Sequence, residues 1–239
     1  MRSAIGTKET REQNLLAPLT ITDSAERYFR RRKPVGFEAL VDFLALDPEN
    51  PSSIYSCLKW ARENAHAVRW QITSEMWETL NSTWLEMKRV RKSDLAGGGA
   101  TRFFDWVKDR SHLFRGVTYG TIVRGEAFNF SRLGTHLERA DNTARILDVK
   151  YHILLPSVKD VGGALDYYQW TALLRSVSAL TAYHWVYRES LKPWLIADLL
   201  HSHGIGEVFQ EGLHEFLFDF RSRNDRLARS IACDYHFTA

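Results

Sequence analysis

Two Glu-x-x-His motifs are the residues of this sequence that best suit metal chemistry. Glu63 and His66 form the first motif, and Glu211 and His214 form the second, each within a segment of helical pattern. Residues three apart lie on the same face of a helix, so each motif places a carboxylate beside an imidazole. In some helical bundles, two such motifs and glutamates from two further helices hold a pair of metal ions. The pattern therefore supports one hypothesis, a helical-bundle dimetal carboxylate enzyme.

The carboxylates that would complete such a site are poorly spaced. Glu126 and Glu138 are the candidates, but they lie on one segment, about three helical turns apart. A dimetal cage needs carboxylates from separate helices that face each other. The sequence also has no nucleophile elbow, phosphate loop or dinucleotide-binding glycine pattern in the required setting. We therefore favour no metal site, expect no cofactor, and leave open whether the protein is an enzyme.

A second set of charged residues lies along the segment 130–154, where apolar residues at three-four spacing predict one seam of a long helix. That seam consists of Phe130, Leu133, Leu137, Ala140, Ala144, Leu147, Tyr151 and Leu154. One position further along, a parallel seam contains only polar residues and glycine: Ser131, Gly134, Glu138, Asp141, Arg145, Asp148 and His152. The candidates for a polar site are Glu138, Arg139, Asp141, Asn142, Arg145 and Asp148.

These charged residues differ in the partners that their own helix offers. Arg145 lies four residues after Asp141 and three before Asp148, so ion pairs within the helix satisfy it. Glu138 has no cation, and Arg139 no carboxylate, three or four residues away. One interpretation is a solvated helix face, on which both side chains meet water. The other is a network with a second helix, in which Glu138→Ala and Arg139→Ala each cost about 2–4 kcal/mol and Arg145→Ala about 0.5 kcal/mol.

The elements that position these residues are all expected to be helices. The apolar period is near 3.5 residues wherever it is legible, and no two-residue alternation or hairpin turn predicts a strand. We therefore expect an all-α fold, a multi-helix bundle of roughly seven or eight helices. Gly97-Gly98-Gly99 marks the clearest break, Asn50-Pro51 is expected to open a helix, and residues 165–186 are expected to form another.

Domain organisation is predicted from where this periodicity begins. Residues 1–33 carry few periodic apolar positions, so we expect a loose or irregular segment there. Residues 34–239 are expected to form a single helical domain, because a chain that is 44% hydrophobic has enough apolar residues for one core of that size.

Composition narrows the possible partners and the compartment. A net charge of +3 falls short of the basic excess of a dedicated nucleic-acid binder, so nucleic acid is not an expected partner. No uninterrupted apolar stretch is long enough for a membrane span, and residues 1–13 lack the apolar core of a signal peptide. The two cysteines, Cys57 and Cys233, form no disulfide framework, which favours the reducing cytoplasm.

The segment 133–152 resembles the Glu-Arg helix after which the Alpha-E family is named. It reads Leu-Gly-Thr-His-Leu-Glu138-Arg139-Ala-Asp-Asn-Thr-Ala-Arg-Ile-Leu-Asp-Val-Lys-Tyr-His. Further stretches that resemble the family span most of the chain from about Leu15 onward: residues 43–54, 61–69, 162–170 and 212–216.

This resemblance implies the kind of system in which the protein works rather than a particular reaction. Members of the family are similar to cytoplasmic helical proteins encoded beside circularly permuted ATP-grasp ligases and transglutaminase-like peptidases, which implies a peptide- or amide-modifying system. Members usually open with an additional helix that carries another Glu-Arg motif, and nothing before Glu138 is similar to it. We therefore expect the chain to lack the usual N-terminal helix. An apolar seam such as the one from Phe130 to Tyr151 would then lie uncovered, which favours a homo-oligomer.

Two functions from different classes follow. The first, which we favour, is a non-catalytic helical partner or substrate-presenting subunit in an ATP-grasp-associated peptide- or amide-modifying system. Its expected protein partners are an ATP-grasp-type ligase and a transglutaminase-like peptidase. The second is the dimetal carboxylate enzyme built on the Glu-x-x-His motifs. The sequence assembles no catalytic constellation that would favour the enzyme.

Overall fold

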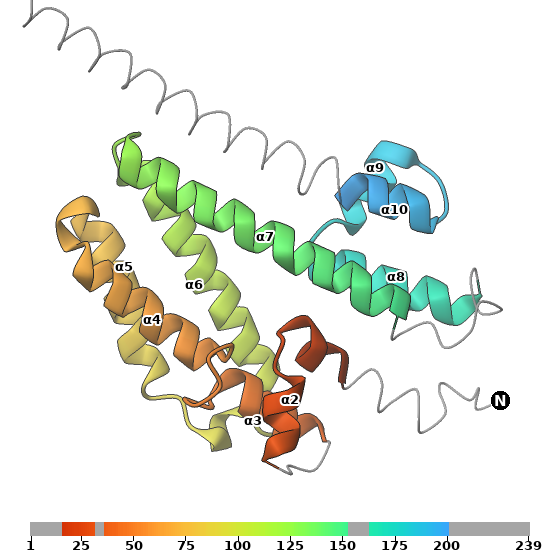
Figure 1. Ribbon diagram of the computed structural model, residues 1–239, viewed down its shortest axis with the longest axis horizontal. Coiled ribbons are helices and arrows are strands. Elements are labelled where there is room, and N and C mark those ends of the chain that lie inside the picture. The colour runs from red at the N-terminus through yellow and green to blue at the C-terminus, as the bar shows by residue number, and fades with distance from the viewer. Residues whose placement is uncertain (1–15, 32–35, 153–162, 201–239) are drawn as a thin grey trace, which may run out of the picture. The chain divides into compact units, whose positions relative to one another are not determined.

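The computed structural model describes residues 16–31, 36–152 and 163–200, and all regular structure in them is helical (Figure 1). Its α-helices are α2 (Ala25–Arg30), α3 (Phe37–Ala45), α4 (Ile54–Ala67), α5 (Ser74–Met87), α6 (Gly99–Thr121), α7 (Glu126–His152), α8 (Ala164–Ser176), α9 (Leu180–Tyr187) and α10 (Pro193–Leu199). Two short 3₁₀ helices also occur: η1 (Arg69–Gln71) lies between α4 and α5, and η2 (Lys92–Leu95) lies between α5 and α6. The predicted all-α, multi-helix fold is confirmed, and eight of the described helices are seven residues or longer.

The described structure divides into two compact units. Unit 1 comprises Met1–Val123 and Asp148–Val158, and unit 2 comprises Arg124–Leu147 and Lys159–Ala239. Helix α7 therefore contributes residues to both units. Each unit has its own buried cluster of apolar side chains.

Unit 1 is built around α5, which packs against α4 on one side and α6 on the other. Thr73 caps the start of α5, because its hydroxyl accepts a hydrogen bond from the backbone N–H of Met76 (3.2 Å). The triple glycine begins α6: Gly97 and Gly98 have φ of 55° and 87°, which glycine adopts without strain. A Cβ on Gly99 would lie 1.9 Å from the carbonyl oxygen of Asp94, so no larger residue fits there.

The N-terminal segment is ordered where the structure describes it, contrary to the expectation of a loose region. Residues 16–21 are helical and α2 follows. Leu19 and Tyr28 are fully buried against Leu40 and Phe43 of α3. The Tyr28 and Phe43 rings meet edge to face, with centroids 5.1 Å apart. The expectation fails because these few apolar residues are covered by α3, a tertiary contact that periodicity does not reveal. Residues 1–15 and 32–33 lie outside the described part.

The predicted cap of α4 is also corrected. Asn50 does not begin that helix: Ser53 does, and its hydroxyl accepts from the backbone N–H of Ser56 (3.1 Å). Asn50 is instead 1% exposed, donates to the carbonyl of Phe43 (3.1 Å) and accepts from the backbone N–H of Ser52 (3.2 Å). The side chain that resembled a helix cap therefore holds the loop between α3 and α4 together, because buried polar groups must be paired.

Unit 2 encloses its core with α8, α9, α10 and part of α7. Trp170, Leu174, Tyr183 and Ile196 are almost fully buried there, and Ile146 and Leu147 are among the α7 residues that pack against this cluster. Residues 165–186 form two helices and not the single one predicted. The chain turns between them at Ser178, whose φ is 58°.

The contact between α9 and α10 gives a pH-dependent prediction. Tyr187 donates a hydrogen bond to Asp198, and this bond, with the carboxylate charge, raises the pKa of Tyr187 to about 12. The neutral phenol is therefore favoured, and this contributes to the stability of the folded state below about pH 10. The contribution is lost as the pH rises through the folded-state pKa of Tyr187. Asp198→Asn should lower the Tyr187 pKa, because an amide carries no charge. Phenolate absorbance measured against pH checks this, with Tyr187→Phe identifying the step. A high-pH step unchanged in both variants would contradict it.

Candidate functional site

The Glu-x-x-His motifs receive no support from the described residues. Glu63 and His66 are both exposed on α4. Glu63 pairs with the neighbouring Arg62 (2.8 Å), and the His66 ring lies 5.8 Å from the ring of Trp77. Within the described ranges, no three His, Cys, Asp or Glu side chains gather to hold a metal ion. The second motif, Glu211 and His214, lies outside those ranges.

The polar-site candidates lie on α7, and most of them face solvent. Arg145 is half-buried, with its side chain 39% exposed. Its Nε donates to Asp141 (2.8 Å), so the pairing predicted within the helix is confirmed for that carboxylate. The other candidates are all exposed: Glu138, Arg139, Asp141, Asn142 and Asp148.

Glu138 and Arg139 form no buried network in the structure. Both side chains are exposed, and within the described part of the chain neither makes an ion pair or a side-chain hydrogen bond. Of the two interpretations that the sequence left open, the solvated face is therefore the one that the structure displays. Among the described residues, a carboxylate and a guanidinium that have no ion-pair partner therefore stand next to each other in the sequence.

This exposure predicts small effects on stability. Glu138→Ala and Arg139→Ala should each change the free energy of unfolding by less than about 0.5 kcal/mol, not by the 2–4 kcal/mol of a buried network, because water already solvates both groups. Thermal melts of the two variants measure this. Val149→Ala is the matched control, since Val149 is 2% exposed on the same helix and its truncation should cost at least about 1 kcal/mol. Melting points lowered equally in all three variants would refute the exposed placement.

The apolar seam of α7 is split between two environments, which corrects the single buried seam expected from the spacing. Leu133, Ala140 and Leu147 are partly buried. Phe130 and Leu137, by contrast, are 58% and 51% exposed. On a helix of 3.6 residues per turn, these two positions fall between the buried line and the polar seam. The outward face of α7 therefore combines apolar and charged side chains, and we define it by Phe130, Leu137, Glu138, Asp141, Ala144 and Arg145.

A second Glu-Arg pair, Glu26-Arg27, lies on α2, so the expectation that no such motif precedes Glu138 is wrong. Glu26 forms an ion pair with Arg30 one turn later, and Arg27 donates to the carbonyl of Glu49 (3.3 Å). Arg31 at the end of α2 pairs with both Asp47 and Glu49. This pair thus has partners, whereas the side chains of the pair on α7 have none among the described residues. Two residues in the sequence could have indicated this short helix. Ser24 lies directly before it, and Tyr28 is its buried apolar residue.

Comparison with known proteins gives one match. The family model Alpha-E, described as a predicted alpha-helical domain with a conserved ER motif, matches residues 1–204 of the 239. The matched range includes both Glu-Arg pairs. No curated protein and no solved structure matches the chain. Within the described residues, no helix has the length and apolar character needed to cross a membrane.

Proposed function

Because the chain belongs to the Alpha-E family, we propose that it serves as a non-catalytic partner or substrate-presenting subunit in a cytoplasmic peptide- or amide-modifying system. Its partner in this proposal is an ATP-grasp-type ligase, with a transglutaminase-like peptidase as a second member of the system. Two observations carry the proposal: the exposed Glu138 and Arg139 make no ion pair within the described residues, and Glu138 adjoins exposed apolar side chains on the outward face of α7.

Such a face has the composition of a protein-binding surface. The centre of an interface is apolar and its rim polar, and contiguous exposed apolar side chains usually mark a contact site. Phe130 and Leu137 provide the apolar part, and Glu138 provides a charge on the same face. Arg139 provides a charge of opposite sign that points about 100° away from Glu138 around the helix. A partner with complementary charges would pair with both, and guanidinium–carboxylate pairs are the stronger kind of hydrogen bond. Charge pairing of this kind sets partner specificity and the rate of association.

The test measures binding of the full-length chain to a purified ATP-grasp-type ligase by biolayer interferometry. Arg139→Glu should weaken the complex at least about tenfold, because it turns an attractive charge into a repulsive one. Arg115→Glu is the matched control: Arg115 is exposed on α6 and makes no ion pair in the described part of the chain. No binding by the unaltered chain, or equal weakening by both variants, would overturn the proposal.

A further inference from the structure

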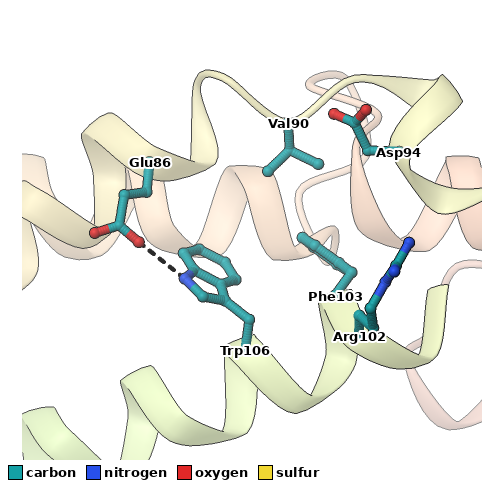
Figure 2. Close-up of a pocket in the computed structure, with 6 residues that line it drawn as sticks. All are labelled: Glu86, Val90, Asp94, Arg102, Phe103 and Trp106. Carbon is teal, nitrogen blue, oxygen red and sulfur yellow. Dashed lines mark hydrogen bonds between the residues drawn. The ribbon is translucent and has the colours of Figure 1, made fainter. Parts of the chain in front are cut away.

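A cavity of about 360 Å³ lies within unit 1, and no residue of α7 lines it (Figure 2). Its volume falls in the range of sites that bind small ligands, about 300–1,000 Å³. It is formed by the last turn of α5, the turn that follows, η2 and the N-terminal part of α6. Its lining residues are Glu86, Val90, Asp94, Arg102, Phe103 and Trp106.

The aromatic wall of this cavity is held in place before any ligand binds. The indole N–H of Trp106 donates to the Glu86 carboxylate (2.9 Å), as Figure 2 shows. Arg110 also donates to both oxygens of that carboxylate (2.7 and 2.6 Å) and lies over the Trp106 ring at 5.9 Å. The Phe103 and Trp106 rings stack with centroids 5.8 Å apart. A wall fixed in this way costs little entropy when it binds a flat or branched apolar group.

The charges around the cavity are unequally satisfied. Glu86 is neutralised by Arg110 and bonded to Trp106, so its carboxylate is already occupied. Arg102 is exposed and makes no ion pair or hydrogen bond within the described residues. Asp94 accepts from the backbone N–H of Arg91 (2.9 Å) and from the Ser93 hydroxyl (3.4 Å). A carboxylate has about four acceptor sites, so Asp94 keeps the capacity for a further donor.

We propose that this cavity binds the C-terminal residue of a peptide whose last side chain is apolar or aromatic. The terminal carboxylate pairs with the free guanidinium of Arg102, which is suited to bidentate contact with a carboxylate. The side chain packs against Val90, Phe103 and Trp106, and the last backbone N–H donates to Asp94. This site uses no residue of α7 and stands whether or not that face binds a partner.

The test uses the full-length chain labelled with ¹⁵N and the indole N–H signal of Trp106, identified by its loss in Trp106→Phe. The probes are N-acetyl-glycyl-phenylalanine, its C-terminal amide, and 3-phenylpropionate, which lacks the peptide N–H. The peptide acid should shift the Trp106 signal, and the amide should bind about tenfold more weakly because it has no charge for Arg102. The propionate should also bind more weakly than the peptide acid, because Asp94 then receives no donor.

Arg102→Gln should reduce binding of the peptide acid to the level of the amide. Arg115→Gln is the matched control, an exposed arginine on the same helix that does not line the cavity. Equal binding of acid and amide, an unshifted Trp106 signal, or equal loss in Arg102→Gln and Arg115→Gln would each overturn the proposal. Equal binding of peptide acid and propionate would overturn the assignment to a peptide.

Discussion

Tyr28→Ala is expected to lower the free energy of unfolding of unit 1 by about 3–5 kcal/mol. Tyr28 is fully buried and its ring packs on that of Phe43, so truncation opens a cavity between α2 and α3. Burial also raises the pKa of the Tyr28 phenol, as expected for a group removed from water. For a chain of this size, the melting point should fall by on the order of 10 °C. Circular dichroism followed through a thermal melt gives the result.

Phe37→Ala is the matched control for this experiment. Phe37 lies on the same helix as Phe43 but is 61% exposed, so its loss should change stability by no more than about 0.5 kcal/mol. The comparison distinguishes a packed N-terminal segment from the loose one that periodicity alone predicts. If Tyr28→Ala melted at the same temperature as Phe37→Ala, residues 16–31 would not be packed on α3 in solution.

The fold could be predicted from the sequence where short-range chemistry determines it. The triple glycine was predicted as the clearest break because its conformation depends on residues within a few positions, and the structure places it at the start of α6. Asn50 was misassigned because its side chain bonds the carbonyl of Phe43, seven residues earlier in the chain. The break at Ser178 escaped detection because a serine at positive φ carries none of the usual glycine signal.

The candidate site, like the fold, could be predicted only where the interacting residues are close together in the sequence. The Arg145–Asp141 pair was predicted because both partners lie on one helix, four residues apart. The spacing of the α7 seam does not determine which half of it faces inward, because that depends on what α7 packs against. The cavity of unit 1 was missed altogether. Its Glu86–Trp106 bond joins residues 20 apart on two helices, and neither residue belongs to a motif.

Self-association is the second large expected effect, and it follows from the outward face of α7. Phe130 and Leu137 are more than half exposed, at 58% and 51%, and Ala144 is exposed about two turns further along. Covering a few hundred Å² of such surface is favourable by roughly 25 cal/mol per Å², or on the order of 5–10 kcal/mol before the entropy of association is subtracted. We therefore expect a dimer or larger species at micromolar concentration when the chain is alone. Size-exclusion chromatography with light scattering measures the mass.

Leu137→Ser should shift that species toward monomer, because it removes apolar surface from the centre of the α7 face. Leu113→Ser, at a leucine 47% exposed on α6, is the matched control and should leave the mass unchanged. If the unaltered chain were a monomer, the α7 face would be stable in contact with water, and the predicted self-association would be wrong. If the same face binds the ligase, adding the ligase should dissociate the self-associated form, because one surface cannot hold two partners at once. A dimer that persisted when the ligase was bound would place the two contacts on different surfaces.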